Sequence, residues 1–136
     1  MAISSIIGTD SNSYELMKEG IKAATVRGKA ISNNIANINT KDYKRFNVVF
    51  EDNLNKSRTS SVDLLTNNYK HLTGTNSTGN VTVEKDESTS MRTDGNNVDL
   101  EVEKVNQAAN TLKYNALVQQ ANSKLSNIKY VIAGGR

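Results

Sequence analysis

Very few side chains in this sequence have the type and spacing that catalysis needs. His71 is the only histidine, and the chain contains no cysteine. Nucleophilic catalysis of the Ser-His-Asp or Cys-His kind would therefore have to use His71. This histidine lies in the polar stretch Tyr69-Lys70-His71-Leu72, where no neighbouring residue indicates an activated serine. A histidine in such a setting is usually solvated, so we expect no catalytic residues and no enzyme activity.

A second candidate for chemistry is the acidic and amide-rich segment 94–99, which is followed by Glu103. Calcium loops of the EF-hand type place oxygen ligands at alternating positions, with a glycine sixth and a glutamate twelfth. Here the glycine is second and Val98 is fifth, so the pattern does not predict a metal site. We interpret the segment as a turn in which Gly95 supplies a permissive φ and Asn97 caps a following helix.

The basic residues predict neither a cofactor nor a nucleic acid. Gly28-Lys29 is followed by Ala30 and lacks the earlier glycine of a phosphate-binding loop. The 17 Lys and Arg residues are scattered and, against 14 acidic residues, leave a net charge of only +3. Nucleic-acid-binding chains usually show a basic stripe with stacking aromatic residues, and aromatic residues make up only 5% here. The charge favours solubility, with no nucleic acid or small-molecule substrate expected.

The apolar content is low for an independent domain. Of 136 residues 36% are hydrophobic, none is Trp, and the mean hydropathy is −0.56. Average globular domains contain roughly 45–50% apolar residues. Burial of apolar surface against neighbouring copies of the chain would compensate for the small hydrophobic core. The absence of cysteine fits an extracytoplasmic destination, and residues 1–8 lack the basic and apolar pattern of a secretory signal peptide.

The first zone of the chain, about 12–39, has the pattern of a long helix. Asn12 and Glu15 form a plausible N-cap and capping box. Apolar or small residues then recur at alternating spacings of three and four, which predicts a helix roughly 40 Å long packed along another helix. Ala24 and Gly28 would let a partner backbone approach closely. The members of this seam are Tyr14, Met17, Ile21, Ala24, Gly28, Ile31, Ile35 and Ile38.

The middle zone, about 40–97, is rich in Ser, Thr, Asn and Gly and poor in large apolar residues. Short alternations at 46–50 and 81–83 indicate strands. A small β element or a mobile loop fits this composition better than a core, and we expect flexibility in residues 55–80.

The third zone, about 98–132, is predicted to be a second long helix, stopped by Gly134-Gly135. It carries two apolar seams offset by two residues, or about 200° around a helix. One partner helix from the same chain cannot cover both seams, so we expect other subunits to cover the rest. The alternative is a small three-helix or α/β domain whose middle zone covers the second face. The first seam is Val98, Val102, Val105, Ala109, Leu112 and Ala116, and the second is Tyr114, Val118, Ala121, Leu125, Ile128 and Ile132.

Asparagines cluster where the first helix ends, in the segment 32–40. Asn33 and Asn37 stand four residues apart and share one face, with Asn34 and Asn39 beside them. One interpretation is a fraying, solvated helix end. The other is a polar face that hydrogen-bonds to adjacent subunits and sets their register.

The same segment, Ser32-Asn33-Asn34-Ile35-Ala36-Asn37-Ile38-Asn39-Thr40, followed by Tyr43-Lys44-Arg45 and Phe50-Glu51, resembles the N-terminal signature of flagellar rod and hook proteins. That family commonly has Pro-Gly where Lys41-Asp42 stand here, and Asp tolerates turn conformations. Two later segments, 92–101 and 110–117, resemble the proximal-rod members of the flagellar basal-body rod protein family. The short length also disfavours the larger distal-rod and hook proteins.

The resemblance implies a mainly α structural subunit without cofactor or metal. Segments 1–45 and 98–136 would form a coiled-coil-like helical hairpin, and 46–97 would form a polar, outward-facing loop or β segment. Such subunits are exported without a cleaved leader and assemble in the periplasm into a hollow helical rod, which transmits torque and encloses the export channel. The implied partners are copies of the chain, FlgC-type rod subunits, FliE, the export gate and the MS ring.

We expect assembly and packing to use the seam and asparagine residues together. They are Met17, Ile21, Ala24, Gly28, Ile31, Asn33, Asn34, Ile35, Asn37, Ile38, Asn39, Val102, Val105, Ala109, Leu112, Tyr114, Val118, Ala121, Leu125, Ile128 and Ile132. Two other functions use the same seams: a FlgC-type rod protein, and a soluble helical binding or adaptor module that forms a discrete small oligomer.

Overall fold

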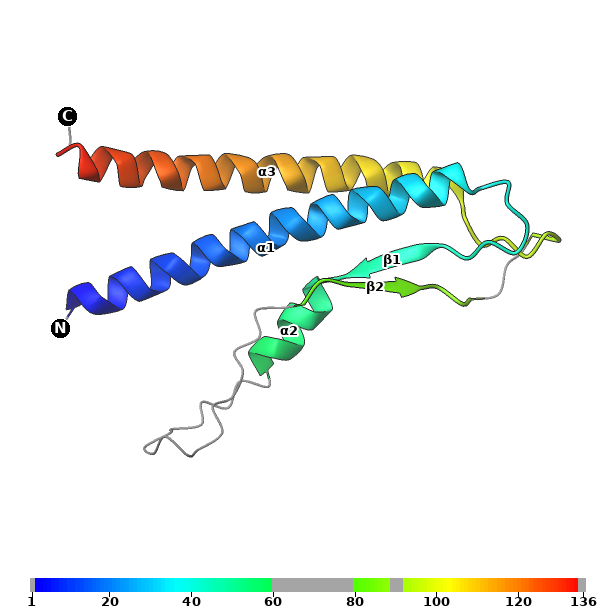
Figure 1. Ribbon diagram of the computed structural model, residues 1–136, viewed down its shortest axis with the longest axis horizontal. Helices are drawn as coiled ribbons and strands as arrows, with labels where there is room; N and C mark the ends of the chain where they lie inside the picture. Colours follow the sequence, from blue (N-terminus) through cyan, green and yellow to red (C-terminus); the bar gives the residue numbers. More distant parts are fainter. Residues whose placement is uncertain (1, 60–79, 89–91, 135–136) are drawn as a thin grey trace.

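The computed structural model describes residues 2–59, 80–88 and 92–134. Two long helices at the ends of the chain dominate it (Figure 1), and a short hairpin lies between them in sequence. The mainly α fold with a small central β element is therefore confirmed. In chain order the elements are α1 (Ala2–Ala36), β1 (Phe46–Val49), α2 (Glu51–Thr59), β2 (Thr82–Lys85) and α3 (Leu100–Ile132).

Helix α1 is longer at its start than the sequence pattern predicted. It begins at Ala2, so Asn12 lies inside the helix and the proposed N-cap at this position is wrong. The apolar spacing of Ile3, Ile6 and Ile7 continues the helical period upstream, which offers a physical reason for the extension. At its other end α1 stops at Ala36, a few residues before the predicted limit, and a turn follows.

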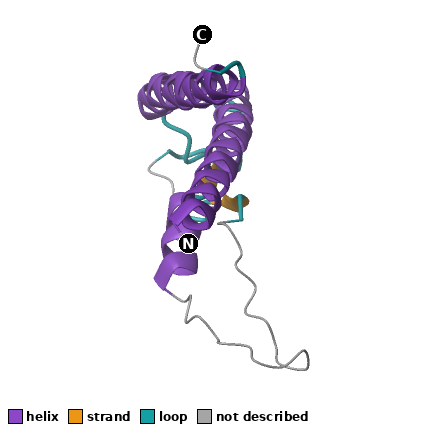
Figure 2. Ribbon diagram, turned by 90° about the vertical axis from the view of Figure 1, so that its left-hand side faces the viewer, coloured by secondary structure: helices purple, strands orange, loops and turns teal. Residues whose placement is uncertain are grey.

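Helices α1 and α3 form an antiparallel hairpin that is tight at one end and open at the other. They meet near the end of α1 and diverge toward the two termini (Figure 1), and the same pair seen from the side shows the crossing (Figure 2). A Cβ atom built on Gly20 would lie 3.1 Å from a methyl carbon of Leu117, which is tighter than an ordinary contact, so the two helices approach closely there. Ala23 and Ala24 are buried on the same face of α1.

The two predicted strands are confirmed and pair as an antiparallel hairpin. Phe46 lies opposite Lys85, and Val49 lies opposite Thr82. Strand β1 contacts α1, which places the hairpin against the pair of long helices. The described part of the chain contains no helix long and apolar enough to cross a membrane.

Helix α2 was not predicted from the sequence. It begins directly after the buried Phe50, with Glu51 and Asp52 in its first turn, where acidic side chains favour a helix start. Residues 55–59 of the expected flexible segment therefore belong to a helix. The rest of that prediction, including His71, lies outside the described residues.

Helix α3 is capped by Asp99 and not by Asn97 as predicted. The Oδ1 atom of Asp99 accepts hydrogen bonds from the backbone N–H groups of Glu101 and Val102, at 2.8 and 3.3 Å. Asn97 instead bonds to the residue that precedes β1: its Oδ1 accepts from the backbone N–H of Arg45 at 2.8 Å. Helix α3 ends at Ile132, just before Gly134 with φ 75°, as the sequence predicted.

The end of α1 is held by a buried amide from the segment before α3. Asn96 is fully buried, and its Nδ2 atom donates to three carbonyl oxygens in the turn after α1, at distances of 2.9 to 3.0 Å. Its Oδ1 accepts from the backbone N–H of Val98 at 2.8 Å. One side chain thus hydrogen-bonds both to the turn after α1 and to the segment before α3. The three carbonyls belong to Asn37, Ile38 and Thr40.

We expect Asn96→Ala to lower the free energy of unfolding by about 1–3 kcal/mol, because the buried backbone N–H of Val98 would lose its acceptor and the turn after α1 would lose three hydrogen bonds. Urea unfolding followed by far-UV circular dichroism measures the change. Asn39→Ala is the matched control, since Asn39 is exposed in the same turn. Equal stability of the two variants would contradict this account of Asn96.

Candidate assembly site

Asn34, from the asparagine segment at the end of α1, is fully buried where α1, β1 and α3 meet. Its Oδ1 accepts from the backbone N–H of Phe46 at 2.9 Å, and its Nδ2 donates to the carbonyl oxygen of Phe46 at 3.0 Å. The side-chain amide therefore pairs with this residue of β1 much as a neighbouring strand would. The same Nδ2 donates to Oε2 of Glu103 in α3 at 3.3 Å.

Glu103 is a buried carboxylate, with a relative exposure of 1%. A buried charge is stable only when it is paired and hydrogen-bonded. Besides Asn34, its partner is Arg45, whose Nη1 lies 3.8 Å from Oε1 of Glu103. The Nε atom of Arg45 lies 2.9 Å from Oδ2 of Asp86 beyond β2. We call Asn34, Arg45 and Glu103 the polar hub.

Two titratable groups beside the polar hub, Asp86 and Tyr43, have shifted pKa values. A backbone hydrogen bond from Ser88, with Arg45 contributing, lowers the pKa of Asp86 below its ordinary value. Burial raises the pKa of Tyr43. The phenol therefore remains a donor, and it donates to Oδ1 of Asn34 at 3.3 Å. The ring of Tyr43 also meets that of Phe46 edge-on, at 6.1 Å between centroids.

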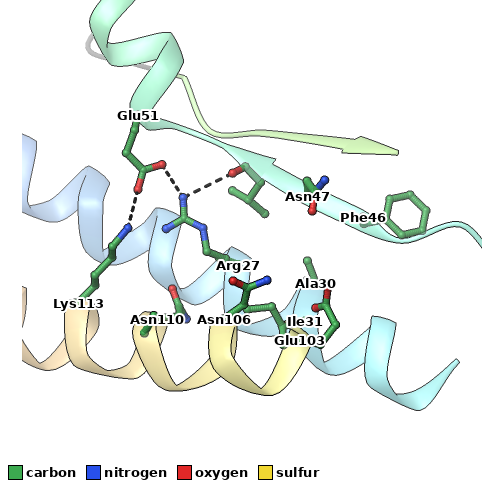
Figure 3. Close-up of a pocket in the computed structure, with 12 residues that line it drawn as sticks. Arg27, Ala30, Ile31, Phe46, Asn47, Glu51, Glu103, Asn106, Asn110 and Lys113 are labelled. Carbon is green, nitrogen blue, oxygen red and sulfur yellow. Dashed lines mark hydrogen bonds and ion pairs between the residues drawn. The ribbon is translucent and has the colours of Figure 1, made fainter. Parts of the chain in front are cut away.

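A groove of about 330 Å³ runs beside the hub between α1, β1 and α3. Figure 3 shows Glu51 reaching from the start of α2 to Arg27 of α1 and Lys113 of α3. Glu51 Oε2 lies 2.6 Å from Arg27 Nη2, and Glu51 Oε1 lies 3.5 Å from Lys113 Nζ. Desolvation opposes ionisation of Glu51, but its backbone hydrogen bond and Arg27 outweigh it and lower its pKa. These ion pairs connect the start of α2, just after β1, to both long helices.

The face of α3 that packs on α1 is largely polar and was missed by the sequence analysis. Asn110 is buried and donates from Nδ2 to the carbonyl oxygen of Ala24 at 2.9 Å, beside Gly28. Nearer the C-terminus, Lys124 Nζ donates to Ser13 Oγ at 2.8 Å. The inner seam is therefore Glu103, Asn110, Leu117 and Lys124, whose regular seven-residue spacing is the sequence signal that could have identified it.

Within α3 the first apolar seam is exposed, although Ala109 also lines the groove beside the hub, whereas Val98, which precedes the helix, is buried. Val105 is 68% exposed and Leu112 is 71% exposed, and Val102, Ala109 and Ala116 are also exposed. The second seam faces α1 but is covered only in part, because the helices diverge along it (Figure 1). In this seam Val118 and Ala121 are half-buried, whereas Tyr114, Leu125, Ile128 and Ile132 are exposed.

The predicted residues of α1 and its following turn are more enclosed. Ala24, Ile31 and Asn34 are buried, and Asn33 and Asn39 are exposed. The remainder are half-buried, namely Met17, Ile21, Gly28, Ile35, Asn37 and Ile38.

The asparagine segment forms hydrogen bonds within the chain. Besides the bonds of Asn34, Asn37 donates from Nδ2 to the carbonyl oxygen of Asn33 at 2.8 Å and accepts at Oδ1 from the hydroxyl of Thr40 at 3.2 Å. The fraying interpretation does not fit these closed contacts. Contacts between this segment and adjacent subunits stay a prediction, for which the exposed Asn33 and Asn39 remain accessible.

Asp42 lies in the turn after α1, at the second of the two positions where the resemblance noted above leads us to expect Pro-Gly. Its φ is 57°, in the left-handed region that Asp tolerates better than most residues. Its backbone N–H donates to the carbonyl oxygen of Asp94 at 2.9 Å, so the turn rests on the segment before α3. Gly95, with φ 77°, leaves the space that the Asp42 side chain occupies.

No residue arrangement in the described ranges indicates catalysis or metal binding. Within residues 2–59, 80–88 and 92–134 no group of three or more His, Asp or Glu side chains is placed to hold a metal ion. The carboxylates that are buried or shifted in pKa pair with Asn, Arg, Lys or backbone N–H groups, which is an arrangement for holding elements together.

Comparisons with known proteins agree with this architecture. The family model described as Flagella basal body rod protein matches residues 18–44, which end in the turn next to the hub. The flagellar basal body rod protein FlgB of Bacillus subtilis is 32% identical over 93% of this chain and 97% of its own length. The proteins of the same name from Borrelia hermsii and Buchnera aphidicola are 29% and 26% identical, over 88% and 91% of this chain and 95% and 96% of their own lengths.

Similarity to these proteins extends over both long helices and the hairpin between them, and not only over the signature at the end of α1. The chain is accordingly a structural subunit of the flagellar basal body that associates with other rod components. It belongs to the FlgB family of flagellar basal body rod proteins.

Proposed function

We propose that the chain assembles through α1 and α3 into the wall of a hollow helical rod, the proximal rod, which encloses the export channel and transmits torque. The observation that supports this is the exposed first seam of α3. The inner face of that helix uses Glu103 and Asn110, whereas Val105 and Leu112 project outward. Exposed aliphatic residues in a regular helical seam are typical of surfaces that another protein covers.

The proposal places the chain in the periplasm, with its hairpin and α2 facing outward from the rod wall. Its partners would be further copies of the chain, rod subunits of the FlgC type, FliE, the export gate and the MS ring. Its role is mechanical and not enzymatic. In this proposal the ion pairs of Glu51 with Arg27 and Lys113 keep the outward segment attached to the helices under torque.

Burial in the rod also accounts for the low apolar content of the chain. An open hairpin leaves much of its apolar surface in water, so a single copy gains little stability along the divergent parts of its helices. Repetition of the same contacts around and along the rod would supply the missing burial. We therefore expect the tight end of the hairpin to be ordered before assembly and the divergent end to become ordered with it.

We expect V105E/L112E to abolish swimming, because charged side chains would lie in the proposed subunit contact. Swimming in soft agar and the presence of the chain in purified basal bodies measure this. The free energy of unfolding should change by no more than about 0.5 kcal/mol, since both positions are exposed in the single chain. The control is A108E/N115E, which adds the same charge at the same spacing to exposed positions on α3. Normal swimming with V105E/L112E would contradict the proposal.

We expect hydrogen exchange in the isolated chain to be faster for residues 121–128 than for residues 103–110. The first range lies where the helices diverge, and the second range packs at the hub. Mass spectrometry of the isolated chain and of basal bodies measures both, and the difference should disappear in basal bodies. Equal, strong protection in the isolated chain would indicate a monomer that completes its own core.

A further inference from the structure

Helix α3 carries two unpartnered apolar surfaces that point in opposite directions at different heights. The outer seam, centred on Val105 and Leu112, occupies its first half and faces away from α1. The second surface, centred on Leu125 and Ile128, occupies its last turns, where Lys124 reaches Ser13 of α1 and the two helices diverge. The two seams are rotated by about 200° from each other around one continuous helix. A single copy can therefore present both surfaces at once.

The second surface is hollowed along the last turns of α3. A hollow of about 340 Å³ is lined by Lys124, Asn127, Ile128, Val131 and Ile132. Val131 is 74% exposed and Ile132 is 81% exposed, so this end of the hairpin lacks a covering layer of its own. An aliphatic seam on another helix is the kind of surface that fits such a lining.

The charge along α3 changes sign, from acidic residues that precede the outer seam to basic residues near the C-terminal end of the helix. Acidic residues outnumber basic ones in residues 84–103, which lead into the outer seam, and Asp99 and Glu101 are exposed there. Residues 104–136 contain no Asp or Glu, and Lys124 and Lys129 flank the second surface. The charge order along α3 thus favours contact between the start of α3 in one copy and its end in another.

We propose that the outer seam of α3 in one copy docks into the opening between α1 and α3 of a second copy, beside Leu125 and Ile128. This inference rests on the proposed rod function and names the surfaces that carry it. One contact of this kind covers both unpartnered surfaces, whereas pairing of the outer seam with itself would leave the second surface in water. Because the two docking surfaces differ, the contact is heterologous, and such contacts extend into open assemblies when they do not close into rings.

The test uses disulfide crosslinking, which is favoured here because the chain has no cysteine of its own. The variants are L112C in the outer seam and I128C at the opening, with L125C as a second acceptor nearly one turn away. A disulfide needs Cα atoms within about 7 Å. Positions 112 and 128 lie about 24 Å apart along one helix, so a bond between them has to join two copies.

We expect oxidation of the full-length L112C/I128C chain to give a ladder of dimers, trimers and larger species, and an equal mixture of the two single variants to give dimers only. Each single variant alone should remain monomeric. The control is L112C/S123C, which keeps the cysteine in the outer seam and moves the other to Ser123, an exposed position that does not line the hollow, and it should give no ladder. The same samples are compared in basal bodies, with crosslinked species identified by mass spectrometry.

Self-crosslinking of L112C alone would overturn the inference, because it would show a symmetric contact. A crosslink only to a different polypeptide in basal bodies would overturn it too, since the occupant would then not be a second copy. Absence of crosslinks to both I128C and L125C, in basal bodies that contain the chain and support swimming, would overturn the inference and leave the proposed rod function intact. Absence of the chain from purified basal bodies would instead contradict the rod function itself.

Discussion

A buried carboxylate imposes the central constraint on this structure. Glu103 is almost fully removed from water, and a charge in that position requires partners at hydrogen-bonding and ion-pairing distance. Asn34 and Arg45 provide them, and each comes from a different part of the chain, the end of α1 and the approach to β1. The β1–β2 hairpin and both long helices therefore have to meet at one point. Correct placement of these polar partners sets the register of α1 against α3.

The distribution of polarity in α3 follows from that constraint and has consequences for assembly. Its inner face near the hub is occupied by Glu103, which meets Asn34, and by Asn110, which packs on Ala24 and Gly28 of α1. Its aliphatic residues are left on the outer face, where Leu112 is largely exposed. In a self-sufficient domain the apolar face would be inside. Because of this inversion, polar contacts within the chain fix how α1 and α3 pack together. The hydrophobic surface of α3 is left available for contacts between chains.

Much of the fold could be predicted from local patterns. Alternating spacings of three and four identified both long helices, and period-two alternation identified both strands, because these periods follow directly from backbone geometry. The predictions that failed concerned ends: α1 starts at Ala2 and not near Asn12, and Asp99 and not Asn97 caps α3. Several residues nearby could serve as caps, and competing hydrogen bonds choose among them. Asn97 is already engaged with the backbone of Arg45.

The amino-acid sequence alone established the two-helix architecture, the excess of seams over available partners and the resemblance to a rod family. It left open which face of α3 turns inward. Periodicity shows that a helix has an apolar face but not what packs against that face. The apolar pattern of α3 gave two seams, and either could have packed against α1. The three-dimensional arrangement brings Gly28, Ala24 and Asn34 of α1 against Asn110 and Glu103 of α3. Hydrogen bonds between residues far apart in the chain fix that choice, and no local pattern contains them.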